Sequence, residues 1–174
     1  MLDIFYQDEY VKLNEGIENG VFEKFNFQCE YGIIEYKYLK RKIDIVYDGI
    51  EYFDIVSPYG FGGPIILECQ NIEKLLNAYF EDFSRYCLIN NIVSEFIRFH
   101  LFDNTVIREK FYGDSIQIST NVVRDFLLKP DEIWRDFKPK VRKNVKRAIS
   151  KNLRIEIDMI GVNLSDFLDI YYNT

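Results

Sequence analysis

The chain has 174 residues, of which 48% are hydrophobic and 29% charged, with a net charge of −6, a composition typical of a folded domain and not of a disordered segment. No stretch approaches the ~20 apolar residues that a membrane-spanning helix needs, and the N-terminus lacks the basic and apolar regions of a secretory signal. The three cysteines are far apart and form no CxxC or Cys/His pattern, which argues against a disulfide scaffold or a zinc site and predicts a reducing, cytoplasmic compartment.

The first part of the chain predicts a short helix followed by three strands. Asp8 is placed to cap a helix that continues to about Ile17. Apolar and polar side chains alternate over residues 25–47, which predicts two strands joined by a turn. A third strand is expected over residues 52–56, and a glycine-rich loop, residues 59–64, follows it.

The middle of the chain contains the strongest helical pattern. Asn71 is a favourable N-cap, and the pattern ends at Asn90. Its apolar residues recur at spacings of three and four: Ile72, Leu75, Leu76, Tyr79, Phe80, Phe83, Tyr86 and Cys87. Such a stripe predicts a helix with one buried face. Two more strands are expected after it, over residues 92–101 and 115–123.

The last third of the chain predicts three helices and one strand. Pro130 fits the first turn of a helix, and Pro139 should end that helix and start another over residues 140–151. A strand is expected over residues 154–159, and a final helix from near Asn163. Together, these elements predict a mixed α/β fold of the α+β type, with helices flanking a mixed, largely antiparallel sheet.

Basic residues are concentrated in one segment. Residues 138–154 contain eight basic and no acidic residues, whereas the rest of the chain contains 14 basic and 28 acidic residues. In the helix expected there, the polar face carries Arg142, Lys143, Lys146 and Arg147. Both a solvated surface and a contact with an anionic partner (a phosphate, an RNA backbone or a membrane surface) fit this face. The narrow apolar stripe opposite argues against insertion into a bilayer.

Two further features have competing interpretations. The loop from Gly60 to Gly63 fits either a tight turn or a ligand-lining loop, and it matches neither GxGxxG nor a P-loop. His100 is the only histidine, so a metal site built on paired imidazoles is excluded. No neighbouring residue supports a nucleophile relay around His100, and a hydrogen-bonded structural role is expected.

Four segments then stand out in chain order: residues 36–43, residues 52–64, residues 95–101, and a last one with Trp134, Phe137, Arg142 to Ala148 and the strand start at Leu153. In this order, over about residues 33–159, the chain resembles the FemAB-like family, the acyl- and aminoacyl-transferring branch of the GNAT fold. Members of that family resemble two GNAT-type halves in one longer chain. The resemblance implies a GNAT-like N-terminal domain over residues 1–160 and the start of a second half over 161–174.

The resemblance also implies an activity, the transfer of an acyl or aminoacyl group to an amine. Known branches of the family build peptidoglycan cross-bridges from aminoacyl-tRNA, which suggests a bacterial cell-envelope or related acceptor. Ser57 stands where GNAT-type acetyl-coenzyme A enzymes carry Arg or Gln, so no coenzyme A phosphate loop is visible and no cofactor is expected within this chain. The sequence does not decide whether the acyl donor is aminoacyl-tRNA or acyl-coenzyme A.

The leading hypothesis is that the chain is the N-terminal part of a FemAB-like acyltransferase and that this part is inactive by itself. The candidate substrate-binding residues are Tyr59, Gly60, Gly62, Gly63, Arg98, Arg142, Lys143 and Lys146. No catalytic or metal-binding residue is identified. The alternatives are a non-catalytic module that binds tRNA or another nucleotide-linked polyanion, and a degenerate GNAT half that serves as a scaffold. No DNA partner is expected. Self-association is expected through the apolar residues Phe167, Leu168 and Tyr171.

Overall fold

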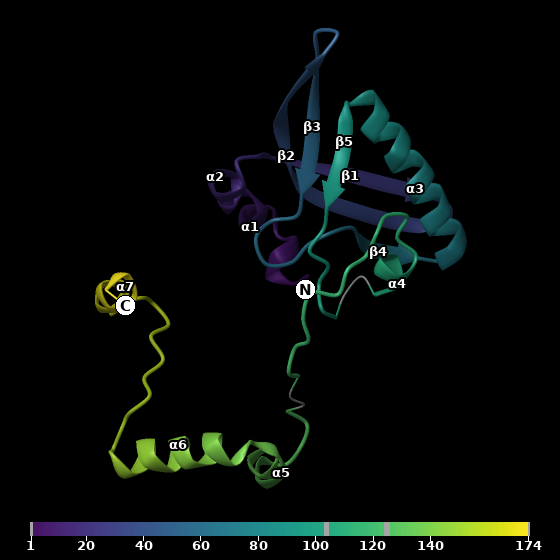
Figure 1. Ribbon diagram of the computed structural model, residues 1–174. Coiled ribbons are helices and arrows are strands. Elements are labelled where there is room, and N and C mark those ends of the chain that lie inside the picture. The colour runs from purple at the N-terminus through teal and green to yellow at the C-terminus, as the bar shows by residue number, and fades with distance from the viewer. Residues whose placement is uncertain (1, 103–104, 124–125, 174) are drawn as a thin grey trace. The chain divides into compact units, whose positions relative to one another are not determined.

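The computed structural model describes residues 2–102, 105–123 and 126–173. The chain divides into two compact units, Met1–Gln117 and Ile118–Thr174 (Figure 1). The sequence suggested a domain boundary near residue 160, between the two halves of a longer protein. This domain boundary stays a prediction.

The first unit is a five-stranded sheet with helices on both faces (Figure 1). Its elements are the 3-10 helix η1 (Ile4–Tyr6), α1 (Asp8–Leu13), α2 (Glu15–Glu18), β1 (Val21–Cys29), β2 (Gly32–Tyr47), β3 (Ile50–Val56), β4 (Ile65–Cys69), α3 (Ile72–Ile89), β5 (Ile92–Phe96) and α4 (Thr105–Glu109). The strand order is β1-β2-β3-β5, and β4 also pairs with β2. All of these pairings are antiparallel except the one between β3 and β5. The predicted α+β fold with a largely antiparallel sheet is therefore confirmed.

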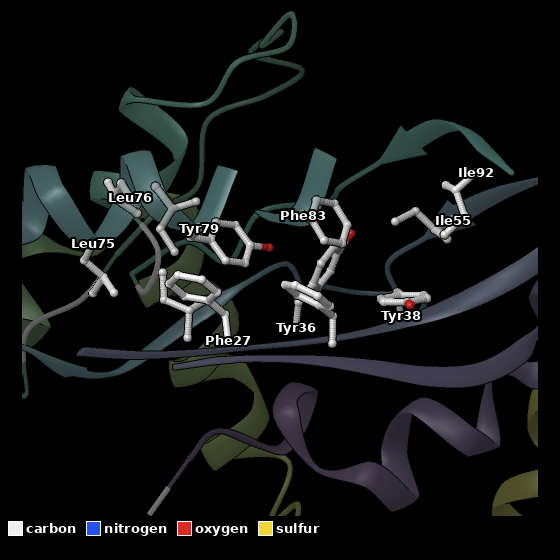
Figure 2. Close-up of a cluster of buried hydrophobic side chains, with 12 residues drawn as sticks. Phe27, Tyr36, Tyr38, Ile55, Leu75, Leu76, Tyr79, Phe83 and Ile92 are labelled. Carbon is white, nitrogen blue, oxygen red and sulfur yellow. The ribbon is translucent and has the colours of Figure 1, made fainter. Parts of the chain in front are cut away.

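Helix α3 covers one face of the sheet and forms the main core with it. Asn71 caps the helix as predicted, its side-chain oxygen accepting from the Lys74 amide at 3.1 Å. The helix buries Leu75, Leu76, Tyr79 and Phe83 against sheet residues that include Phe27, Tyr36, Tyr38, Ile55 and Ile92 (Figure 2). Each large apolar side chain buried here contributes about 1.5–3 kcal/mol before chain entropy is counted.

Helix α1 covers part of the opposite face. Val11 of α1 is fully buried against Leu39 and Val56. Leu39 follows Tyr38 and Val56 follows Ile55, so each strand alternates between the two cores, as a strand buried on both faces must. This second layer brings the N-terminal helices close to the end of β3.

The turn between β2 and β3 is a two-residue hairpin turn at Asp48 and Gly49. Their φ angles are 51° and 77°, both in the left-handed region. Asp-Gly is favoured in such turns because both central residues need positive φ, and the resulting twist matches that of the paired strands.

Several sequence expectations in this unit need correction. Gln7, not Asp8, occupies the cap position, and Asp8 is the first helical residue. The expected single helix is interrupted at Asn14. The strand expected over residues 92–101 ends at Phe96. Residues 115–123 form no strand in the part of the chain that the structure describes, since alternation becomes a strand only where a neighbouring strand supplies backbone hydrogen bonds.

The second unit contains the helices α5 (Pro130–Asp136), α6 (Pro139–Ser150) and α7 (Leu164–Tyr172). Pro130 and Pro139 each begin a helix, as predicted. Residues 154–159, all of which the structure describes, do not form the expected strand. Instead, the Asp158 carboxylate accepts hydrogen bonds from the amides of Ile160, Gly161 and Asn163. None of the helices within the described residues is long and apolar enough to cross a membrane.

Candidate functional site

The glycine-rich loop lies at the carboxyl ends of the parallel strands β3 and β5. These strands end at Val56 and Phe96, which are register partners. In open α/β sheets, ligands commonly bind outside the carboxyl ends of parallel strands, where the loops that leave them can diverge. The segments after Val56 and Phe96 are therefore the candidate site of the first unit.

Hydrogen bonds join the two segments that leave these strands. Ser57 is fully buried; its amide donates to the Phe96 carbonyl at 3.0 Å, and its Oγ accepts from the Arg98 amide at 2.9 Å. Farther along, the Gly62 amide donates to the Arg98 carbonyl at 2.9 Å, and Gly62 forms an isolated parallel bridge with Phe99. The structure thus brings together two predicted parts of the site, the loop and Arg98.

Packing and backbone conformation explain the glycines of the loop. Gly60 and Gly63 have φ angles of 96° and 101°, which favour glycine. A Cβ at Gly60 would lie 2.6 Å from the Phe5 ring, and one at Gly62 would lie 3.0 Å from the Ser57 Cβ. Within the described residues, the amides of Gly60 and Gly63 donate no hydrogen bond; Gly60 is partly exposed, whereas Gly63 is buried.

The N-terminal segment covers one side of the loop. The Tyr10 hydroxyl donates to the Tyr59 carbonyl at 2.8 Å. The Phe5 ring packs edge-on against Tyr10 and Phe61, at 5.2 and 5.3 Å between ring centroids. Tyr59 is 66% exposed and is the most exposed residue of the loop.

Arg98 is already paired with acidic and carbonyl groups. One guanidinium nitrogen, Nη1, donates to Glu18 Oε1 at 3.2 Å and to the Ser57 carbonyl at 3.1 Å. Glu18 also lies 3.9 Å from Arg41, which in turn binds Asp54. The hydrogen bond to Asp54 raises the pKa of Arg41. A ligand anion would therefore meet an Arg98 whose charge is largely balanced, and would have to use its other N–H groups.

His100 is buried beside the loop in a structural role. Its Nδ1 accepts from the Phe102 amide at 3.3 Å, and its Nε2 lies 3.6 Å from an Asp3 carboxylate oxygen. Four aromatic rings contact the imidazole: Phe5, Tyr6, Phe61 and Phe102. These contacts agree with the expected structural role of this histidine.

The remaining predicted residues, Arg142, Lys143 and Lys146, lie on α6 in the second unit. Arg142 donates to the Arg135 carbonyl at 3.4 Å. Within the described residues, no basic side chain of α6 forms an ion pair with an acid. The predicted substrate-binding residues thus form two separate groups, one in each unit.

The charged groups around Arg98 were not predicted from the sequence. Arg41 and Asp54 lie on neighbouring strands, on the face opposite Tyr38 and Ile55, and a cross-strand pair of opposite charges was the available signal. Glu18 lies 80 residues before Arg98, and no sequence pattern connects them. Among the described residues, no group of His, Cys, Asp or Glu is placed to hold a metal ion.

Comparison of the chain with models of protein families, with curated proteins and with solved structures found no match.

Proposed function

We propose that the chain is the N-terminal part of a FemAB-like acyltransferase, which transfers an acyl or aminoacyl group to an amine of a cell-envelope or related acceptor. The observation that carries this proposal is the position of the Tyr59–Gly63 loop, at the carboxyl ends of the parallel strands β3 and β5. In the proposal, this loop lines the acceptor cleft and Tyr59 contacts the acceptor.

The chemistry of acyl transfer fits the groups of this loop. The attacking amine must be neutral, and the tetrahedral intermediate needs fixed donors for its oxyanion. The amides of Gly60 and Gly63 are backbone donors that have no partner within the described residues. No general base is assigned, and the donor site is assigned to the rest of a longer protein.

The test is an acyl-transfer assay of the longer protein that the resemblance implies, beside this chain alone, with aminoacyl-tRNA and acyl-coenzyme A as donors. We expect turnover by the longer protein and none by this chain, because half a cleft cannot align donor and acceptor. Tyr59→Ala should lower kcat/KM about tenfold or more, corresponding to about 1.4 kcal/mol, with an unchanged melting temperature.

Tyr47→Ala is the matched control. Tyr47 is also 66% exposed but lies at the tip of the β2–β3 hairpin. Its loss should leave kcat/KM unchanged. Absence of transfer from both donors, or a Tyr59→Ala enzyme as active as the Tyr47→Ala enzyme, would refute the proposal.

One observation favours the second candidate, a non-catalytic module that binds polyanions. The basic side chains of α6 are unpaired within the described residues, although neutralising acids are abundant elsewhere in the chain. A helix face that gathers unpaired positive charge is typical of phosphate contacts. Binding of tRNA by the longer protein without any transfer would favour this candidate.

A further inference from the structure

Residues 153–159 alternate between apolar and polar side chains but pair with no strand in the described part of the chain. Leu153, Ile155, Ile157 and Met159 are 70, 94, 82 and 84% exposed. This period of two is the pattern of a strand that is covered on one side. Within the described residues, the amides of residues 154–158 donate no hydrogen bond. The segment therefore has the side chains and the free backbone groups of a strand that lacks its neighbour.

The helices on either side of this segment are uncovered as well. Every residue of α6 and α7 is described, and none of them is buried. On α7, Phe167 and Tyr171 are 59 and 65% exposed. An accumulation of exposed apolar side chains marks an interaction site in soluble proteins. Within the second unit, nothing covers the apolar side of residues 153–159.

The charges of residues 153–159 are complementary to those of the same segment in a second copy. When two such segments run antiparallel with Ile155 opposite its counterpart, Arg154 of each copy lies opposite Glu156 of the other. Leu153 of each copy then lies opposite Ile157 of the other. Opposite charges thus meet on one face of the pair and apolar side chains on the other, and both kinds of contact stabilise paired strands.

The neighbouring registers lack this match. A slip of one residue sets apolar side chains opposite charged ones, because successive side chains point to opposite faces. A slip of two residues sets Arg154 opposite Arg154, or Glu156 opposite Glu156. Like charges directly opposite each other destabilise a strand pair. The register centred on Ile155 is therefore favoured over its neighbours.

We propose that residues 153–159 pair antiparallel with the same segment of a second copy, centred on Ile155, so that two chains form a dimer through their second units. This inference goes beyond the proposed acyl transfer and does not depend on it. It also gives the self-association expected from the sequence a defined contact, a strand pair with a two-fold axis.

Helix α7 is placed to cover the apolar side of this pair. Two strands alone are marginally stable, so the pair needs such a cover. The helix begins at Leu164, a few residues after Met159. The Asp158 carboxylate organises the turn between them by accepting from the amides of Gly161 and Asn163. The exposed rings of α7 thus follow directly on the segment that they would cover.

The test is sedimentation equilibrium of the full chain and of charge-reversal variants. Arg154→Glu and Glu156→Arg should each lower the dimerisation constant about tenfold or more, because two attractive pairs become two repulsive ones. The double variant, with both reversals, should dimerise like the wild type, since its pairs are again of opposite charge. Arg147→Glu is the matched control, a charge reversal on α6 outside the paired segment, and should leave the constant unchanged.

All four changes lie outside the first unit, so its melting temperature should stay unchanged and show that the fold is intact. A wild-type chain that is monomeric at every concentration would overturn the proposal. So would a dimer that the single reversals do not weaken, or a double variant that dimerises no better than the single ones. These outcomes leave the acyl-transfer proposal untouched, because none of them measures transfer.

Cysteine cross-linking measures the register independently. Ile155→Cys places a thiol opposite its counterpart on the two-fold axis, within reach of a disulfide between the two copies. Ile157→Cys is the control, because its thiol lies opposite Leu153 and away from its counterpart. Both variants contain the same three native cysteines. We expect the Ile155→Cys chain to oxidise to a covalent dimer faster than the Ile157→Cys chain, and equal rates would contradict the register.

Discussion

Arg41 and Asp54 are register partners on β2 and β3 and form a two-point ion pair, with Nε and Nη2 at 2.8 and 2.5 Å from the two carboxylate oxygens. Arg41 also approaches Glu18, which binds Arg98. The pair therefore connects the middle of the sheet to the candidate site through α2. Glu18 thus lies between the guanidinium groups of Arg41 and Arg98.

Asp54→Asn should lower the free energy of unfolding by about 1 kcal/mol, because a charge-assisted two-point contact is lost at a partly exposed position. Lys42→Gln is the matched control, since it breaks the neighbouring but more exposed pair of Lys42 with Glu51. This control should change the stability by less than about 0.5 kcal/mol. Urea denaturation of both variants measures the difference, and equal effects would show that the Arg41–Asp54 pair is no stronger than a surface pair.

Leu76→Asp should unfold the first unit or nearly so, because it places a charge at a position that is 1% exposed in the core. An unpaired charge there costs about 4 kcal/mol or more, a large part of the stability of an ordinary domain. Leu88→Asp on the same helix, at a position that is 80% exposed, should change the stability by less than about 0.5 kcal/mol. A thermal melt followed by circular dichroism compares them. A Leu76→Asp protein with the melting temperature of the wild type would show that the packing of α3 against the sheet does not stabilise the first unit.

The contribution of Asp8 to the free energy of unfolding should be lost at acidic pH. Its hydrogen bond with Lys37, together with the contact to Lys24, lowers the pKa of Asp8. A lowered pKa means that this contribution is present above the unfolded-state pKa of about 3.9 and is lost as the pH falls through the folded-state value. Asp8→Asn should therefore cost up to about 1 kcal/mol at pH 7, and the difference from wild type should shrink as the pH falls through the folded-state pKa of Asp8. A difference that is constant from pH 7 to pH 2.5 would contradict this account.

If α6 contacts a polyanion, replacing Arg142, Lys143, Lys146 and Arg147 by Gln should weaken binding of single-stranded RNA without changing the fold. Four phosphate contacts give a slope of log K against log salt of about −3 in the starting protein, and the variant should lose most of this slope. The control replaces four exposed cations of the first unit, Lys12, Lys42, Lys74 and Lys110, and matches the charge change. An equal loss of affinity in both variants would assign binding to net charge and not to α6.

The sequence by itself determined the elements whose signals are local. Asn71 and the apolar stripe after it specified α3, because capping and a three-to-four spacing act within one helix. Pro130 and Pro139 specified the starts of α5 and α6, because proline fixes φ and lacks an amide donor. Alternation located β1, β2 and β3, and the charge of the α6 segment was evident from the residues alone.

Only the tertiary structure decided which residues meet across strands and between distant segments. Continuing the hairpin register from Tyr47 and Ile50 would pair Arg41 with Val56, but the irregularity between Lys42 and Val46 shifts the register and pairs Arg41 with Asp54. Residues 115–123 and 154–159 alternate as strands do and still form none within the described residues. The physical reason is that strand pairing and register depend on contacts between residues far apart in the chain, which no local pattern encodes.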